Sequence, residues 1–180
     1  MKKIFKYIFA GMAAMSVVAC SEDALETSPS SSVSGNELLG TATNALVSLN
    51  GVYRAMYTAG VSNSSNTHQC FGITAYNLVA DVMGEDCIMN GQGSGWFWYD
   101  CVYNVKSRYT STGWRSYDMW NGYYTWISNV NYILAEEETM SGSETEKNYV
   151  LGQAYAVRAY SYFMLAQMVS RTYKGQESEP

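Results

Sequence analysis

Residues 114–135 read WRSYDMWNGYYTWISNVNYILA, and residues 143–173 read SETEKNYVLGQAYAVRAYSYFMLAQMVSRTY. In both stretches apolar side chains recur every three or four positions, which is the spacing along one face of an α-helix. These positions are Trp114, Tyr117, Trp120, Tyr124, Ile127, Val130 and Leu134 in the first stretch, and Val150, Ala154, Val157, Ser161, Leu165 and Met168 in the second. The sequence therefore predicts two long amphipathic helices whose apolar faces lie in the core.

The ends of these two helices carry residues that favour helix initiation. Ser111 or Thr112 can cap the first helix. Ser143 and Glu146 have the spacing of a capping box at the start of the second. The short connection over residues 136–142 predicts an antiparallel helix hairpin, the unit of tetratricopeptide-type repeats. Because a lone hairpin cannot bury both of its faces, earlier helices must cover it or the chain must continue beyond residue 180.

A further helix is predicted N-terminal to the hairpin, between Leu38 and Gly60. Ser34 and Glu37 form a second capping-box pattern before it, and Gly60 is a typical helix stop. Its apolar positions have helical spacing: Leu38, Ala42, Ala45, Leu46, Leu49, Val52, Tyr53 and Met56. Residues 37–180 are therefore expected to form one mainly helical, all-α domain.

The segment before the hairpin combines a helix with two loops. Residues 73–83 have the spacing of a second helix, between a polar loop over 61–69 and a glycine-rich loop over 84–95. The aromatic run over residues 96–103 predicts a short strand.

The first 19 residues have the character of a lipoprotein signal peptide. Three lysines precede a mostly apolar stretch that is too short to cross a bilayer comfortably. Val17, Val18 and Ala19 then lead to Cys20, whose thiol is the expected lipid attachment point. An ordinary signal peptide is the alternative. Residues 20–36 are serine-rich and are expected to be a flexible, lipid-anchored tether.

The charge of the chain excludes some partners. The formal net charge is −5 at pH 7, and removal of the three leader lysines takes it to −8. An acidic protein repels nucleic acid and anionic headgroups, so no nucleic-acid partner is expected. The anchor must therefore come from acyl chains.

Cysteine and histidine usage argues against metal or catalytic chemistry. Besides Cys20, the chain has Cys70, Cys87 and Cys101, which allow at most one internal disulfide with its pairing open, and no CxxC occurs. These three are expected to be small buried side chains. His68 is the only histidine, so no catalytic triad or multi-histidine metal site is expected. On its polar loop it is expected to be a solvated surface residue, and no cofactor is implied.

Three motifs can be read along the chain after Cys20. Leu25 and Pro29 form a short Leu-x-x-x-Pro element. The first hairpin helix carries Trp120, Tyr124, Ile127, Asn131 and Leu134, and the second carries Ala154, Arg158, Ala159, Tyr160, Tyr162, Phe163 and Leu165. Together these motifs resemble the N-terminal part of the SusD/RagB family of nutrient-binding outer-membrane lipoproteins, in which the short element follows the lipid anchor. Arg158 is expected to stack on rings and to join the two helices rather than to bind ligand.

The resemblance implies a function and a location. A SusD-like protein captures a glycan at the cell surface and hands it to a TonB-dependent, SusC-like transporter. The acidic stretch after Cys20 resembles a surface-export signal, so the protein is expected on the outer membrane, held by lipid and exposed. Family members are much longer than this chain, which is therefore expected to be an incomplete N-terminal portion.

The candidate glycan-binding residues lie before the hairpin. Aromatic faces pack on the C–H faces of sugars, while amides and carboxylates bind the hydroxyls. The resemblance places a binding aromatic on the loops of this region, and the candidates are Trp96, Trp98, Tyr99, Asp81, Asp86 and Asn90.

Two other functions remain open. One is a helical-repeat scaffold lipoprotein that binds proteins and no glycan. The other is a surface hydrolase using the carboxylates of Asp81, Glu85 and Asp86. Binding without catalysis is the interpretation that the resemblance favours.

Overall fold

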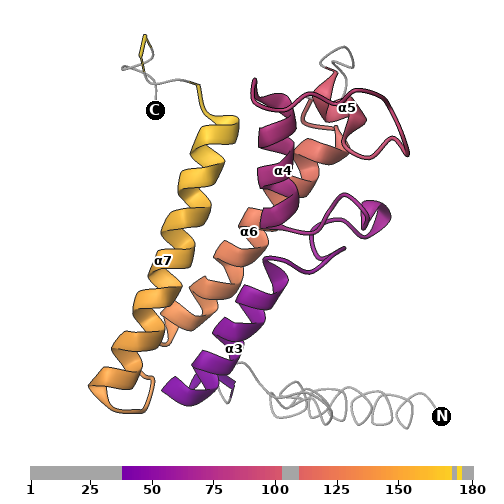
Figure 1. Ribbon diagram of the computed structural model, residues 1–180. Helices are drawn as coiled ribbons and strands as arrows, with labels where there is room; N and C mark the ends of the chain where they lie inside the picture. The colour runs from indigo at the N-terminus through magenta and orange to yellow at the C-terminus, as the bar shows by residue number, and fades with distance from the viewer. Residues whose placement is uncertain (1–37, 103–109, 172–173, 176–180) are drawn as a thin grey trace, which may run out of the picture. The chain divides into compact units, whose positions relative to one another are not determined.

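The computed structural model describes residues 38–102, 110–171 and 174–175 (Figure 1). The chain divides into two units, Met1–Gly35 and Asn36–Pro180, and all described residues belong to the second. The expected signal peptide, Cys20, the expected tether and the Ser34–Glu37 capping-box pattern lie outside the described residues. The described part is mainly helical, as predicted, and its order is α3, the 3₁₀ turn η2, α4, α5, α6 and α7.

The predicted hairpin consists of α6 (Trp114–Ala135) and α7 (Glu144–Val169), which lie against each other in antiparallel directions (Figure 1). The capping box at the start of α7 is present: Glu146 N–H donates to Ser143 Oγ at 3.3 Å, and Ser143 N–H donates to Glu146 Oε2 at 2.9 Å. The start of α6 differs from the prediction, because its N-cap is Gly113 rather than Ser111 or Thr112.

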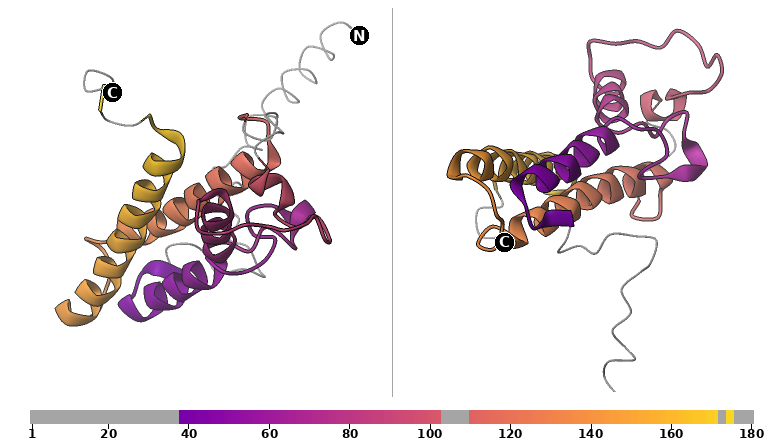
Figure 2. Two further views of the ribbon diagram at one scale, coloured as in Figure 1. Left: turned by 45° about the horizontal axis from the view of Figure 1, so that its top comes forward. Right: turned by 90° about the horizontal axis from the view of Figure 1, so that it is seen from below.

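Helix α3 (Ala42–Ala55) packs against both α6 and α7 (Figure 2). It begins later than predicted, because the Thr41 hydroxyl caps it by accepting from Asn44 N–H at 3.1 Å. It also ends before Gly60, with Met56 as its C-cap. The Ser141 carbonyl accepts from Ala42 N–H at 2.9 Å, which fixes the start of α3 to the hairpin turn.

These three helices enclose the hydrophobic core. Most of the positions predicted from helical spacing are buried or half-buried; the exposed ones include Leu38 and the three residues of α6 described below. The core includes Ala45, Leu49 and Val52 of α3, Tyr123, Trp126, Ile127, Val130 and Ile133 of α6, and Val150, Ala154, Val157 and Leu165 of α7.

Helix α4 (Ile73–Met83) has the bounds that the sequence predicts, and it packs against the short helix α5 (Trp98–Cys101). Tyr76 of α4 inserts against α6, where a Cβ added to Gly122 would overlap its hydroxyl. The strand predicted for residues 96–103 is wrong for the described positions 96–102, which hold α5 instead. No strand lies beside this segment in the described part of the chain, and Phe97 turns it with a φ of 56°.

Candidate functional site

Two loop segments that are distant in sequence meet at Trp96. The Trp96 ring lies against the His68 ring, with centroids 5.2 Å apart and planes inclined at 42°. Both side chains are exposed, and Trp96 retains 51% of its accessible surface. His68 is thus at the surface, as expected, and its ring also contacts that of Trp96, a candidate glycan-binding residue.

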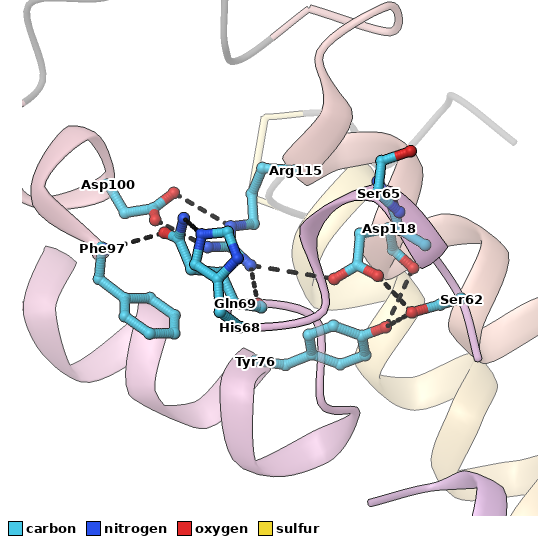
Figure 3. Close-up of polar contacts among 10 residues, drawn as sticks. Ser62, Ser65, His68, Gln69, Tyr76, Phe97, Asp100, Arg115 and Asp118 are labelled. Atoms are coloured by element: carbon cyan, nitrogen blue, oxygen red, sulfur yellow. Dashed lines mark hydrogen bonds and ion pairs between the residues drawn. The ribbon is translucent and has the colours of Figure 1, made fainter. Parts of the chain in front are cut away.

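Gln69 joins the two loops beneath this ring pair. Its Oε1 accepts from Phe97 N–H at 2.8 Å, and its Nε2 lies 3.0 Å from His68 Nε2 (Figure 3). Its backbone carbonyl accepts from Arg115 Nη1 at 2.8 Å. One residue therefore ties the loop before α4, the loop before α5 and the first turn of α6 together.

A buried ion pair supports these loops from below. Arg115 donates to both carboxylate oxygens of Asp100, from Nε at 3.2 Å and from Nη2 at 2.9 Å. Both side chains are almost inaccessible. The guanidinium also lies over the rings of Phe97 and Trp114, 5.1 and 4.3 Å from their centroids. Such a paired, two-point contact is what permits a guanidinium to be buried.

Asp118 lies one helical turn after Arg115 and is fully buried. Its Oδ1 accepts from the Ser62 hydroxyl, and its backbone carbonyl accepts from the Tyr76 hydroxyl at 3.0 Å (Figure 3). The closest Arg115 nitrogen is 3.9 Å away, too far for a hydrogen bond. Burial therefore raises the pKa of the Asp118 carboxyl, and the Ser62 hydrogen bond and the Arg115 charge offset that rise only in part.

Cys70 lies beside this carboxylate. Burial, with the nearby charge of Asp118, raises the pKa of its thiol to about 12. A thiol with such a pKa stays protonated near neutral pH and is a poor nucleophile. The cysteines at 70, 87 and 101 are all free, and Cys87 is exposed, contrary to the expectation that all three are buried.

The other candidate residues are spread around this platform. Trp98 is half-buried and Tyr99 is exposed, both on α5. Asp81 is exposed near the end of α4, while Asp86 and Asn90 are exposed on the following loop. Among the described residues, no hydrogen bond joins these three polar side chains to Trp96. The structure thus brings the Trp96 ring together with the His68 ring, which Gln69 contacts in turn.

A second aromatic surface lies on α6 and α7. Tyr117, Trp120 and Tyr124, predicted as core, are 53%, 47% and 39% exposed. The prediction is wrong because α3 and α7 pack on the other faces of α6, and Tyr76 of α4 packs there against Tyr123 and Trp126. The exposed Tyr162 of α7 adjoins this surface, with its ring centroid 6.4 Å from that of Tyr124. A hollow of about 550 Å³ adjoins it, lined by Thr110, Ser111, Ser116, Tyr117, Trp120, Met168 and Val169.

Arg158 has the structural role expected from the sequence. It donates to Asn131 Oδ1 at 3.0 Å, across the hairpin, and its guanidinium lies 4.9 Å from the centre of the Tyr155 ring.

The buried pair was missed by the sequence reasoning. Arg115 and Asp118 are polar residues three positions apart at the start of an aromatic helix, and Asp100 interrupts an aromatic run. A charge within an otherwise apolar stretch is a signal of a buried pair, but its partner cannot be assigned without the fold.

Neither a metal site nor a membrane span is found in the part of the chain that the structure describes. No three histidine, cysteine or carboxylate side chains gather there in a way that could hold an ion. None of the described helices combines the length and apolar character needed to cross a bilayer.

Comparison with known proteins gives one match. A family model described as "Starch-binding associating with outer membrane" matches residues 79–179, which is more than half of the chain. No curated protein and no solved structure matches the chain.

Proposed function

The chain belongs to the SusD-like family, and we propose from this premise that it binds oligosaccharides at the cell surface and delivers them to a TonB-dependent, SusC-like transporter. The family match carries the proposal, since the family is described as starch-binding and associated with the outer membrane. Lipid on Cys20 would hold the protein at that membrane and raise its local concentration near the transporter.

The binding site that we assign is centred on Trp96. An exposed indole whose loop is anchored by a buried ion pair offers a preorganised face for a sugar ring, which lowers the entropic cost of binding. Tyr99, and the exposed part of Trp98 on α5, would extend the aromatic surface. Asp81, Asp86 and Asn90 would supply hydroxyl partners as the ligand extends from the platform.

Affinity electrophoresis in gels containing amylose tests this site. The full chain should be retarded, and the double variant Trp96→Ala, Trp98→Ala should migrate as in a gel without amylose. Trp120→Ala is the matched control, because it removes an exposed indole elsewhere on the surface. Unchanged retardation of the double variant would overturn the site assignment.

Anchoring and delivery need separate tests. Cys20→Ala should move the protein from the membrane fraction to the soluble fraction, and externally added protease should degrade the anchored protein on intact cells. Co-purification with a co-expressed SusC-like transporter tests the partner. Recovery of the protein without the transporter would argue against delivery.

The aromatic surface of α6 and α7 favours a second candidate, a scaffold that binds a protein helix. Two adjacent helices form a groove that accepts the side-chain ridge of a third helix. An exposed aromatic patch of this kind marks an interaction surface. Two results together would support the scaffold function instead. The double variant Trp120→Ala, Tyr124→Ala would no longer co-purify with the transporter, and the unaltered chain would not be retarded by amylose.

A further inference from the structure

We propose that His68 and Gln69 form one binding platform with Trp96 for a neutral hexose oligosaccharide, in which His68 Nδ1–H donates to a sugar hydroxyl. This inference rests on the proposed glycan-binding function and adds the polar half of the site. The sequence places His68 and Gln69 28 and 27 positions before Trp96, but the fold puts their side chains in one cluster.

The hydrogen-bond network fixes the orientation of the Gln69 amide. Phe97 N–H can only donate, so the Gln69 atom that faces it at 2.8 Å must be the carbonyl oxygen. The amide nitrogen then faces His68 Nε2 at 3.0 Å and donates to it.

This orientation selects one tautomer of His68. A neutral imidazole has one donor and one acceptor nitrogen, and the hydrogen bond at one nitrogen determines the role of the other. Because Nε2 accepts from Gln69, Nδ1 must carry the proton. His68 thereby carries a donor nitrogen on a ring that contacts the exposed Trp96 ring, and a sugar with an apolar ring face and a flanking hydroxyl can use both groups.

The platform is held in place by contacts below it. Arg115 binds the Gln69 carbonyl and, through Asp100, the first turn of α5. Gln69 N–H also donates to the Asn66 carbonyl at 2.8 Å, which closes the loop on itself. The position of His68 is thus set by the backbone of both loops.

The charge of the described surroundings favours a neutral ligand. Arg115 is the cation that contacts this cluster, and it is buried against the carboxylates of Asp100 and Asp118. The platform of His68, Gln69 and Trp96 therefore offers no exposed cation to pair with a uronic acid or a sulfated sugar. Its imidazole and amide groups can form hydrogen bonds with the neutral hydroxyls of a hexose.

The tautomer can be measured directly, because the chain has one histidine. Long-range ¹H–¹⁵N correlation on the labelled full chain should show a protonated Nδ1 and an unprotonated Nε2. In Gln69→Glu the carboxylate can still accept from Phe97 but cannot donate, so the Nε2 of His68 should become protonated. A wild-type spectrum with protonated Nε2 would overturn the assignment.

Calorimetric titration with maltoheptaose tests the role in binding. His68→Phe keeps a ring beside Trp96 but removes the donor, and it should weaken binding about fivefold, the equivalent of one hydrogen bond. Trp96→Ala should remove measurable binding. Tyr132→Ala, an exposed residue on α6, should leave the affinity unchanged.

The outcomes separate the two proposals. Loss of binding in Trp96→Ala with full binding in His68→Phe overturns the role of His68 and leaves the glycan site standing. Full binding in both variants overturns the site itself. Binding of an oligogalacturonate in place of maltoheptaose overturns the neutral ligand class.

Discussion

Replacing Arg115 by Met should destabilise the fold more than any surface change. The substitution keeps much of the side-chain volume but leaves the Asp100 carboxylate buried without either of its two guanidinium hydrogen bonds. It also removes the donor to the Gln69 carbonyl. Removing one partner of a buried pair costs about 3–5 kcal/mol. Domains have a total stability of about 5–15 kcal/mol, so a large part of the stability would be lost.

A double-mutant cycle separates the ion pair from general packing. Urea unfolding followed by circular dichroism and tryptophan fluorescence would give the free energy for Arg115→Met, Asp100→Leu and the double variant. The double variant should be more stable than the sum of the single effects by about 1–3 kcal/mol, because neither the Asp100 carboxylate nor the Arg115 guanidinium is left buried without the other. Additivity within about 0.5 kcal/mol would refute the reasoning.

Three further predictions concern other parts of the fold. Gly122→Ala should lower the free energy of unfolding by about 1–3 kcal/mol, because its Cβ would overlap a buried tyrosine hydroxyl, as urea unfolding would show. Ser143→Ala should cost about 1 kcal/mol through loss of the helix cap. The hydrogen bonds with Ser143 lower the pKa of the Glu146 carboxyl. The capping box should therefore stabilise the fold fully above the ordinary pKa of a glutamate, and this stabilisation should be lost as the pH falls through the lowered pKa of Glu146. Iodoacetamide at pH 8, followed by mass spectrometry, should label exposed Cys87 and spare Cys70.

Matched controls accompany these tests. Gly152→Ala on α7 meets no atom within 4 Å, so it should be neutral or stabilise the helix, and destabilisation equal to that of Gly122→Ala would contradict the steric argument. A thermal-stability difference between wild type and Ser143→Ala that does not shrink in acid would contradict the proposed Ser143–Glu146 linkage. Labelling of Cys70 at the rate of Cys87 would show that the region around Asp118 is open in solution.

Local signals in the sequence were sufficient for α3, α4, α6 and α7, but not for α5, which was predicted as a strand. The bounds of α4 and the capping box of α7 follow from apolar spacing and from side-chain chemistry within a few residues. Arg158 could likewise be assigned a structural role, because a cation among helical aromatics has few other partners. The family resemblance agrees with the match over residues 79–179.

The buried face of α6 could not be assigned in the same way. Aromatic residues occur on almost every side of this helix, so the hydrophobic pattern alone does not choose between the faces of Trp120 and Trp126. The choice depends on where α3 and α7 pack and on where Tyr76 of α4 inserts, which are properties of the tertiary structure.

The sequence by itself determined α3, α4, α6 and α7, the capping box of α7, the hairpin and the presence of an aromatic run at Trp96, because each depends on residues close together in the chain. Only the tertiary structure decided that Trp96 lies against His68, and that Arg115 joins Asp100 to the carbonyl of Gln69. These contacts link segments tens of residues apart. A charged side chain can be buried there only once the fold has supplied its partners.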